Sequence, residues 1–424
     1  MESIYRELGI QEAIFELVQA ADLRIADRLT CIRSRAERRQ YRVLRAFQQE
    51  EVAYRHFAPT TGYGYDDIGR DTLERLYARC FGAEDAIVRP HIASGTHALA
   101  LCLQGLLGKG EGLLSASGKP YDTLEEVIGL RPARGSLLDW GITYRQVELT
   151  SAGCLDIPGV VAAVRAYPEV RVVYVQRSRG YAWRRSLSVT EIGALAREIH
   201  ALNPQIVVAV DNCYGEFVDE WEPTELGADV IVGSLIKNPG GGLAPTGGYI
   251  AGKKELIEQI GYRLTAPGIG REVGSWAASY APFYQGLFLA PHVVGECLQG
   301  AMLTAEVMRT LGFEVLEEAE RGDIIQAIRF QSAEQLIAFC QGIQKASPVD
   351  SYVVPEPWDM PGYACPVIMA AGTFVQGASI ELSIDAPVQP PYIAYMQGGL
   401  TYAHVKIGLM TALTELARKG LLLS

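Results

Sequence analysis

The feature that most restricts the fold of this chain is an alternation of short apolar runs with amphipathic segments. β-Branched and other apolar residues dominate residues 170–178, 205–214 and 228–237, whereas residues 188–204 place apolar side chains at helical spacing. Apolar runs that alternate with helices predict strands buried on both faces of a mostly parallel sheet, with helices on both faces. The fold class is therefore α/β, and ligands of such sheets bind beyond the carboxyl ends of the strands.

The chain length predicts more than one domain, because 424 residues exceed the size at which a single core stops growing. Residues 1–60 are expected to form a helical arm, which packs either across a partner subunit or on its own chain. Residues 61–290 are expected to form the large α/β domain. Residues 291–424, where strands and helices mix, are expected to form a smaller α+β domain.

Charge and composition exclude several classes of partner. The net charge of −11 argues against nucleic acid and anionic membranes, which basic surfaces attract. No apolar run approaches the ~18 residues that cross a bilayer, and the N-terminus lacks the pattern of a signal peptide, so we expect a cytoplasmic protein. The eight cysteines form no CxxC pair and the six histidines no HxxxH spacing, so neither a metal site nor a disulfide framework is expected.

Three chemically distinctive groups follow predicted strands of the large domain. Asp211 comes directly after one apolar run, Lys237 ends another, and Ser94, Gly95 and Thr96 open a predicted helix. Each has a structural explanation when it is considered alone. An aspartate after a strand is commonly a turn residue, a serine before a helix is commonly its cap, and a lysine can extend to solvent.

Taken together, these groups match one cofactor, pyridoxal phosphate. Its phosphate requires N–H donors, which a helix beginning at Ser94–Thr96 offers. Its protonated ring nitrogen requires a buried carboxylate, which Asp211 supplies, and its aldehyde requires a lysine such as Lys237. A buried position is expected to lower the pKa of Lys237, which would favour the neutral amine.

The order of the motifs adds a family resemblance that spans nearly the whole chain. SGTHA, PYDT, AVDNCYGE and GSLIKNPGGG follow one another, together with GYGYDDIGRDTLE, VQRSRGYAWRRSL, GASIELSIDAP and YMQGGLTYAHVK. This combination resembles the fold-type I pyridoxal-phosphate enzymes of Cys/Met metabolism, and more narrowly the methionine γ-lyase-like, or aluminium-resistance, proteins. The resemblance implies the fold of the PLP-dependent transferases and a homodimer or homotetramer whose subunits share active sites.

The resemblance also assigns roles to individual residues. Lys237 would hold the cofactor as a Schiff base and move protons at the substrate Cα, while Asp211 would hold the ring nitrogen. Tyr121 would stack on the ring and assist the leaving group. The phosphate would be bound by Ser94, Gly95, Thr96 and Ser234, and, from a neighbouring subunit, by Tyr63 or Tyr65 together with Arg70.

One position departs from the pattern of the related lyases. They bind the substrate carboxylate through an arginine in an R-x-S-x-G strand, where this chain has Glu381. A carboxylate cannot replace a bidentate guanidinium. Either Arg177 or Arg179, from a basic cluster, binds the substrate instead, or the substrate is held differently, or Glu381 is a surface residue at a loosely matched position.

The resemblance implies a carbon–sulfur lyase that eliminates a thiol from a sulfur-containing amino acid, in the manner of methionine γ-lyase or cystathionine lyase. Because one scaffold hosts many reactions, γ-replacement, aldol cleavage and transamination are alternatives. A cofactor-binding stress or metal-tolerance protein with little turnover is a third class.

Overall fold

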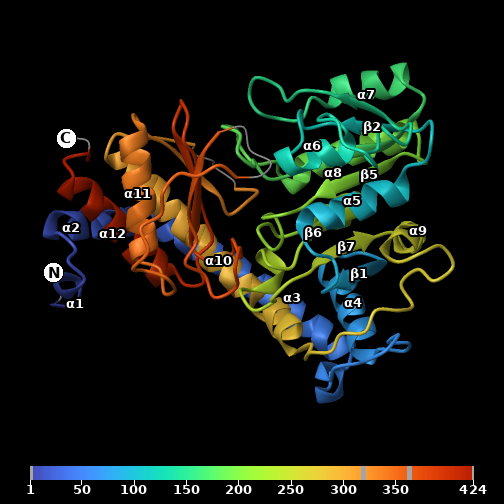
Figure 1. Ribbon diagram of the computed structural model, residues 1–424, viewed down its shortest axis with the longest axis horizontal. Coiled ribbons are helices and arrows are strands. Elements are labelled where there is room, and N and C mark those ends of the chain that lie inside the picture. Colours follow the sequence, from blue (N-terminus) through green and yellow to red (C-terminus); the bar gives the residue numbers. More distant parts are fainter. Residues whose placement is uncertain (1–2, 317–320, 361–364, 423–424) are drawn as a thin grey trace.

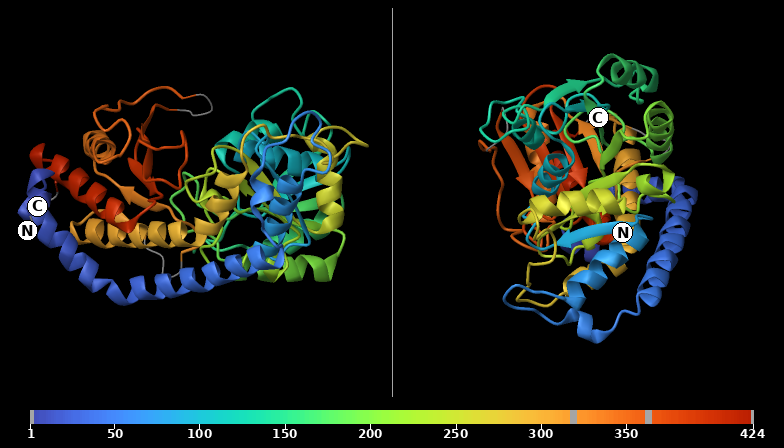
Figure 2. Two further views of the ribbon diagram at one scale, coloured as in Figure 1. Left: turned by 90° about the horizontal axis from the view of Figure 1, so that it is seen from below. Right: turned by 90° about the vertical axis from the view of Figure 1, so that its right-hand side faces the viewer.

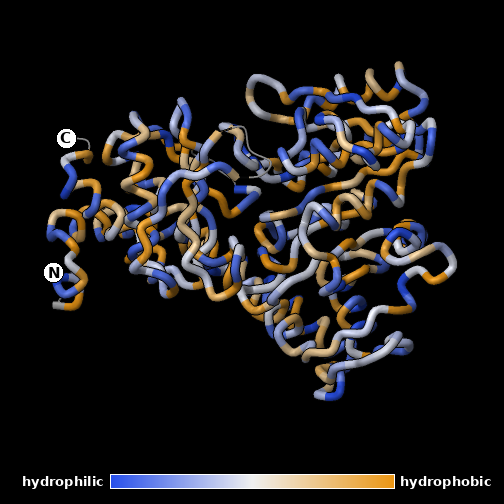
Figure 3. Tube along the Cα trace, viewed as in Figure 1, coloured by the Kyte–Doolittle hydropathy of each residue, from blue (hydrophilic) through white to orange (hydrophobic). Residues whose placement is uncertain are grey.

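The computed structural model describes residues 3–316, 321–360 and 365–422. They form two parts, each built around its own sheet, and one long helix, α10 (Ala281–Thr310), runs from the first part into the second (Figure 1). Hydrophobic residues recur through the strands and helices of both parts (Figure 3).

The larger sheet has seven strands in the order β1-β7-β6-β5-β4-β2-β3. Their bounds are β1 (Asp85–Arg89), β2 (Gly112–Ser115), β3 (Thr143–Gln146), β4 (Val170–Gln176), β5 (Val207–Asp211), β6 (Val230–Ser234) and β7 (Gly248–Gly252). The five strands from β6 to β3 are parallel, as predicted, whereas β7 runs antiparallel to both of its neighbours. The sheet is therefore mixed.

Helices cover both faces of this sheet, which explains why its strands read as continuous apolar runs. On β5, Val208 and Val210 join one hydrophobic core, while Val207 and Ala209 join the core on the opposite face. The helices of this part are α4 (Ile68–Cys80), α5 (Gly95–Leu106), α6 (Asp122–Ile128), α7 (Ile157–Ala166), α8 (Val189–Leu202) and α9 (Lys254–Leu264), with single 3₁₀ turns at Tyr54–Phe57, Pro223–Leu226 and Asn238–Gly240.

The smaller sheet is antiparallel, in the order β10-β11-β12-β9-β8. Two helices that contact each other, α11 and α12, belong to the same part. The bounds are β8 (Glu314–Val315), β9 (Gln326–Arg329), α11 (Ala333–Lys345), β10 (Val367–Ala370), β11 (Ser383–Pro387), β12 (Ile393–Gln397) and α12 (Tyr402–Arg418).

The N-terminal residues form the predicted helices, α1 (Ser3–Glu7), α2 (Glu12–Arg24) and α3 (Ala26–Gln49). Helix α3 packs along α10 of its own chain, and Figure 2 shows both helices extending beside the two parts. Arg24 at the end of α2 donates to Glu306 of α10 over 2.6 Å. The predicted boundary near residue 290 falls inside α10, so the division at that residue stays a prediction.

None of the helices that the structure describes combines the length and apolar character required to cross a membrane. The described residues contain no group of three or more His, Cys, Asp and Glu side chains arranged to hold a metal ion.

Candidate active site

A cavity opens beyond the carboxyl ends of β4 and β5, between the two sheets. The larger part contributes Gly95, Thr96, Tyr121, Gln176, Tyr181, Asp211, Cys213, Tyr214 and Lys237, among others, and the smaller part contributes Ile325, Asp385 and Gln397. Five residues that the sequence predicted for one site, Lys237, Asp211, Gly95, Thr96 and Tyr121, therefore line a single cavity. This position agrees with the rule for parallel sheets.

Lys237 lies three residues beyond Ser234, the last residue of β6, and not at the strand end as predicted. Its Nζ is 4.2 Å from the ring centroid of Tyr214, which also lines the cavity. The prediction of a lowered pKa is wrong for this chain without a cofactor. Burial does lower the pKa of Lys237, but the acidic groups around it, Cys213, Tyr214, Asp211 and Glu216, outweigh burial and raise it.

The glycines that follow Lys237 lie against α10. A Cβ at Gly241 would lie 2.4 Å from the carbonyl oxygen of Gly286 in α10. Gly241 has a φ of 54°, which a residue with a side chain rarely adopts. These glycines let the loop after Lys237 pack directly on α10.

Asp211 is the last residue of β5 and is almost fully buried. Its Oδ1 accepts the backbone N–H of Cys213 at 3.1 Å, and its Oδ2 accepts the hydroxyl of Tyr174 at 3.4 Å. Burial raises the pKa of Asp211, while the charge of Lys237 and these hydrogen bonds oppose that rise. A buried carboxylate of this kind gains most from a cationic partner, such as a protonated ring nitrogen.

The first turn of α5 faces the same cavity. Ser94 is its N-cap, and the Ser94 hydroxyl accepts the N–H of His97 at 3.0 Å, so Ser94 caps the helix and lies outside the cavity lining. Gly95 and Thr96 line the cavity, and the hydroxyl of Thr96 lies 2.7 Å from that of Thr123. The remaining N–H groups of a first turn have no acceptor within their helix, and they favour anions.

Ser234 and Tyr121 flank this turn. A Cβ built on Gly95 would lie 3.4 Å from the Cβ of Ser234, so the structure brings Ser234 beside the helix start as the motif order suggested. The backbone N–H of Tyr121 donates to the side chain of Gln176 over 2.7 Å, which orients the loop that carries the tyrosine ring. A carboxylate, a lysine, an aromatic ring and a helix N-terminus in one cavity fit pyridoxal phosphate.

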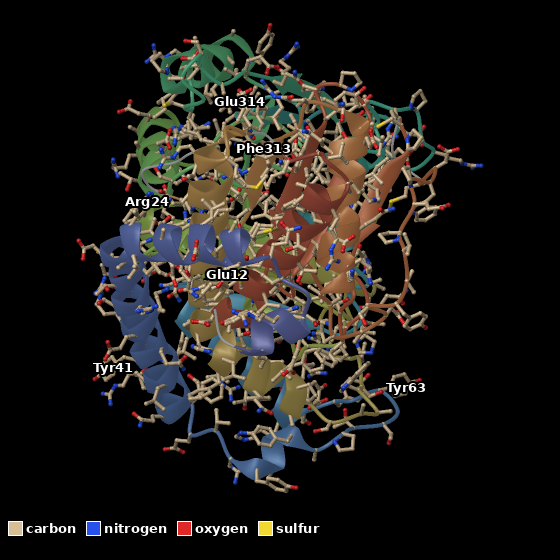
Figure 4. All side chains as sticks on the ribbon, turned by 90° about the vertical axis from the view of Figure 1, so that its left-hand side faces the viewer. Glu12, Arg24, Tyr41, Tyr63, Phe313 and Glu314 are labelled. Atoms are coloured by element: carbon tan, nitrogen blue, oxygen red, sulfur yellow. The ribbon has the colours of Figure 1, made fainter. Side chains whose placement is uncertain are left out.

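Tyr63, Tyr65 and Arg70 do not line the cavity of their own chain. Tyr63 is 73% and Tyr65 is 63% exposed, and Figure 4 shows Tyr63 at the periphery of the molecule. Arg70 is buried and donates to the carbonyl of Gly64 over 2.8 Å, so it holds the loop that presents the two tyrosines. Their role in a neighbouring subunit stays a prediction.

Arg177 and Arg179 are both buried in ion pairs and neither lines the cavity. Arg177 donates to Asp219 over 2.6 Å, and Arg179 donates to Asp323 over 3.1 Å and 3.2 Å. Arg179 thereby links the loop after β4 to the smaller part. Arg179 lines an adjoining hollow that shares Tyr121, Gln176 and Tyr181 with the cavity, so substrate binding by either arginine stays a prediction.

Glu381 is not a surface residue, and it does not line this cavity. It is 3% exposed, and its carboxylate accepts the backbone N–H groups of Phe374 and Val375, both at 2.9 Å. The residue of the same motif that lines the cavity is Asp385, four positions later. The alternation of side chains along a strand could have indicated Asp385, whereas Gln397, Gln176 and Tyr181 reach the cavity only through tertiary packing.

The family described as methionine gamma-lyase matches residues 14–417. The YnbB protein of Bacillus subtilis (strain 168) is 53% identical over 391 residues, which cover 91% of this chain and 92% of YnbB.

Solved structures place the chain among enzymes of the same fold. A carbon–sulfur lyase involved in aluminum resistance from Clostridium novyi NT superimposes with a TM-score of 0.94 at 47% identity, covering 98% of each chain. The pyridoxal-5′-phosphate-dependent protein YhfS from Escherichia coli superimposes with a TM-score of 0.62 at 16% identity, covering 89% of this chain and 96% of YhfS. The second likeness shows the shared fold alone.

Proposed function

The chain belongs to the methionine gamma-lyase family, and on that premise we propose that it is a pyridoxal-phosphate-dependent carbon–sulfur lyase. Its substrate would be a sulfur-containing amino acid, from which β- or γ-elimination releases a thiol and, after addition of water, leaves a 2-oxo acid and ammonia. The observation that carries the proposal is the cavity that unites Lys237, Asp211 and the N-terminus of α5. The Clostridium novyi protein described above, named a carbon–sulfur lyase, supports the reaction class.

Lys237 and Asp211 would have separate chemical roles around the cofactor. Pyridoxal phosphate, when bound, supplies an electron sink that stabilises negative charge at the substrate Cα. Lys237 would hold the cofactor and then move the Cα proton, for which it must act as a neutral amine. Asp211 would keep the ring nitrogen protonated, and this pairing would also remove one of the charges that raise the pKa of Lys237.

The remaining groups of the cavity would bind the phosphate, stack on the cofactor ring and limit the access of water. Gly95, Thr96 and Ser234 would bind the phosphate at the start of α5, where N–H groups and the helix dipole favour an anion. Tyr121 would stack on the ring, and its hydroxyl would protonate the departing sulfur. Because the smaller sheet closes the cavity through Ile325, Asp385 and Gln397, it would also limit the access of water to the reacting atoms.

The proposal is tested with purified protein loaded with pyridoxal phosphate. L-Methionine, L-homocysteine, L-cystathionine and L-cysteine are supplied separately, and thiol, 2-oxo acid and ammonia are measured together. Lys237→Ala is expected to lose both turnover and the visible absorbance of the bound cofactor, whereas Lys253→Ala, an exposed lysine that pairs with Asp229, is expected to keep both.

The products also separate the alternative reactions on the same scaffold. Glycine with an aldehyde would indicate aldol cleavage, a new amino acid would indicate γ-replacement, and an oxo acid without ammonia would indicate transamination. The lyase assignment is abandoned if none of the four amino acids yields a thiol or hydrogen sulfide together with an oxo acid. Cofactor binding without turnover of any kind would favour the stress or metal-tolerance class.

We also propose that Tyr63 and Tyr65 complete the phosphate site of a neighbouring subunit, since both are exposed on a loop that Arg70 holds in place. Mixing the Lys237→Ala protein with a Tyr63→Phe/Tyr65→Phe protein after partial denaturation tests this sharing. Hybrid oligomers would contain one intact site, so activity is expected to recover in the mixture. A mixture as inactive as its two components would contradict the proposal.

A further inference from the structure

The wall of the cavity formed by the smaller sheet carries a carboxylate, Asp385 on β11. Its side chain is 8% exposed and lines the cavity together with Gln397 of β12 and Tyr181 of the larger part. The hydroxyl of Tyr181 donates to Asp385 Oδ2 over 3.0 Å, and Nε2 of Gln397 donates to the same oxygen over 2.9 Å. Two donors from different parts of the molecule therefore fix the orientation of this carboxylate.

Both hydrogen bonds favour the ionised form of Asp385. A carboxylate only accepts, and Tyr181 and Gln397 both donate to it, so a proton on Oδ2 would remove an acceptor that both use. Burial raises the pKa of Asp385, while the bonds from Tyr181 and Gln397 and the charge of Lys237 oppose that rise. Within the described part of the chain no hydrogen-bond donor reaches Oδ1, which leaves this oxygen available to a ligand.

The charge of the cavity lining makes this carboxylate unusual for an amino-acid site. Among the described residues that line it, Lys237 is the one cation, and the proposed function commits its amine to the cofactor. Arg177 and Glu381 bind partners outside the cavity, and Arg179, which lines an adjoining hollow, pairs with Asp323. Asp211 would have the ring nitrogen of the cofactor as its counterpart, whereas the described residues of the cavity lining offer Asp385 no cation once Lys237 is engaged.

We propose that Asp385 determines substrate specificity by binding a positively charged group on the side chain of the substrate amino acid. The inference rests on the proposed function, because the α-amino group is used at the cofactor and a second cation is therefore required. The substrate class is a thioether amino acid with an ammonium group beyond its sulfur. An anionic side chain would meet a buried like charge, and a neutral one would leave Asp385 Oδ1 desolvated without a partner.

A series of three cysteine thioethers of matched length tests the charge preference. S-(2-Aminoethyl)-L-cysteine is cationic, S-propyl-L-cysteine is its neutral counterpart, and S-carboxymethyl-L-cysteine is anionic. With the wild-type holoenzyme, kcat/KM is obtained from thiol release. The apparent Kd is obtained independently from the change in absorbance of the bound cofactor. The cationic compound is expected to bind at least about tenfold more tightly than the neutral one, as for a desolvated charge pair.

Two variants locate the effect. Asp385→Asn retains the size of the side chain and removes its charge, so the cationic compound is expected to lose its advantage and the anionic compound to gain. Glu381→Gln is the matched control, since it neutralises a buried carboxylate of the same motif that lies outside the cavity lining. It is expected to preserve the ranking of the three compounds.

The outcomes separate this inference from the proposed lyase activity. Thiol release from all three compounds with similar Kd values would leave the lyase standing and overturn the role of Asp385. An equal weakening of all three compounds in Asp385→Asn would also overturn it, because it would indicate contact with a group that they share. Binding ranked by charge without thiol release would support Asp385 and contradict the lyase. If Asp385→Asn does not bind the cofactor, the role of Asp385 is judged from the wild-type holoenzyme alone. Tighter binding of the cationic compound than of the neutral and anionic ones would support it, and similar Kd values would overturn it.

Discussion

Glu216 offers a sharp test of how burial controls ionisation beneath the site. Its Oε1 accepts the hydroxyl of Tyr249 at 2.8 Å, and Oε2 has no hydrogen-bond partner within the described residues. Burial raises the pKa of Glu216 from 4.5 to about 8, although the hydrogen bond from Tyr249 and the charge of Lys237 oppose that rise. At neutral pH the carboxyl group is therefore mainly protonated in the folded chain.

The sign of the effect on stability follows from proton linkage. Above pH 5 the unfolded chain has largely lost this proton while the folded chain retains it, so stability falls as pH rises toward the folded pKa. Each pH unit in that interval lowers the free energy of unfolding by about 1.4 kcal/mol, which amounts to about 4 kcal/mol over three units. The stabilising contribution of Glu216 is complete below its unfolded pKa and is lost as pH rises through the interval to about 8.

The substitution Glu216→Gln removes the ionisation and retains the shape of the side chain. The free energy of unfolding in urea is measured at pH 5, 6, 7 and 8, at fixed protein and cofactor concentrations. Relative to wild type, Glu216→Gln is expected to gain about 4 kcal/mol between the lowest and the highest pH. Glu258→Gln, at an exposed position of α9, controls for the loss of a surface charge. Parallel curves for wild type and Glu216→Gln would refute the reasoning.

Two further substitutions test structural roles assigned above. Arg177→Met is expected to lower the free energy of unfolding by about 3 kcal/mol, because it removes the ion pair with Asp219 and the hydrogen bonds to Asn212 and Gly215, and urea unfolding measures the loss. Unchanged stability together with weakened amino-acid binding would indicate that Arg177 binds the substrate. Gly286→Ala would place a Cβ 2.2 Å from the carbonyl oxygen of Gly240, so a lower Tm and weaker cofactor binding at Lys237 are expected. Wild-type values of both quantities would contradict the close packing.

Local sequence signals predicted the part of the cavity that lies at the carboxyl ends of the parallel strands. Asp211 and Lys237 follow apolar runs, and parallel strands bring such ends to one edge, so their proximity follows from the sheet. The antiparallel strand β7 was not predicted, because its five residues, Gly248–Gly252, include two glycines and give a weak strand pattern. Whether a sheet is mixed depends on such short strands.

The surroundings of several predicted site residues depend on partners that are distant in sequence. Arg179 pairs with Asp323, 144 positions away, and neither residue signals the other in the sequence. The pKa of Lys237 could not be predicted from burial alone, because its direction is decided by side chains such as Asp211 that the fold gathers around it. Charged clusters in a sequence indicate where ion pairs form, but not which side chains they leave available to a ligand.

The continuity of α10 through both parts has a consequence for recombination between related enzymes. This helix contacts β8, β9 and β12 of the smaller sheet, and the loop after Lys237 packs on the same helix at Gly286. A crossover inside Ala281–Thr310 would join helix halves that were selected against different neighbours. Chimeras that exchange the wall bearing Asp385 while retaining the cofactor wall should therefore take the whole helix from one parent, with the junction before Ala281 or after Thr310.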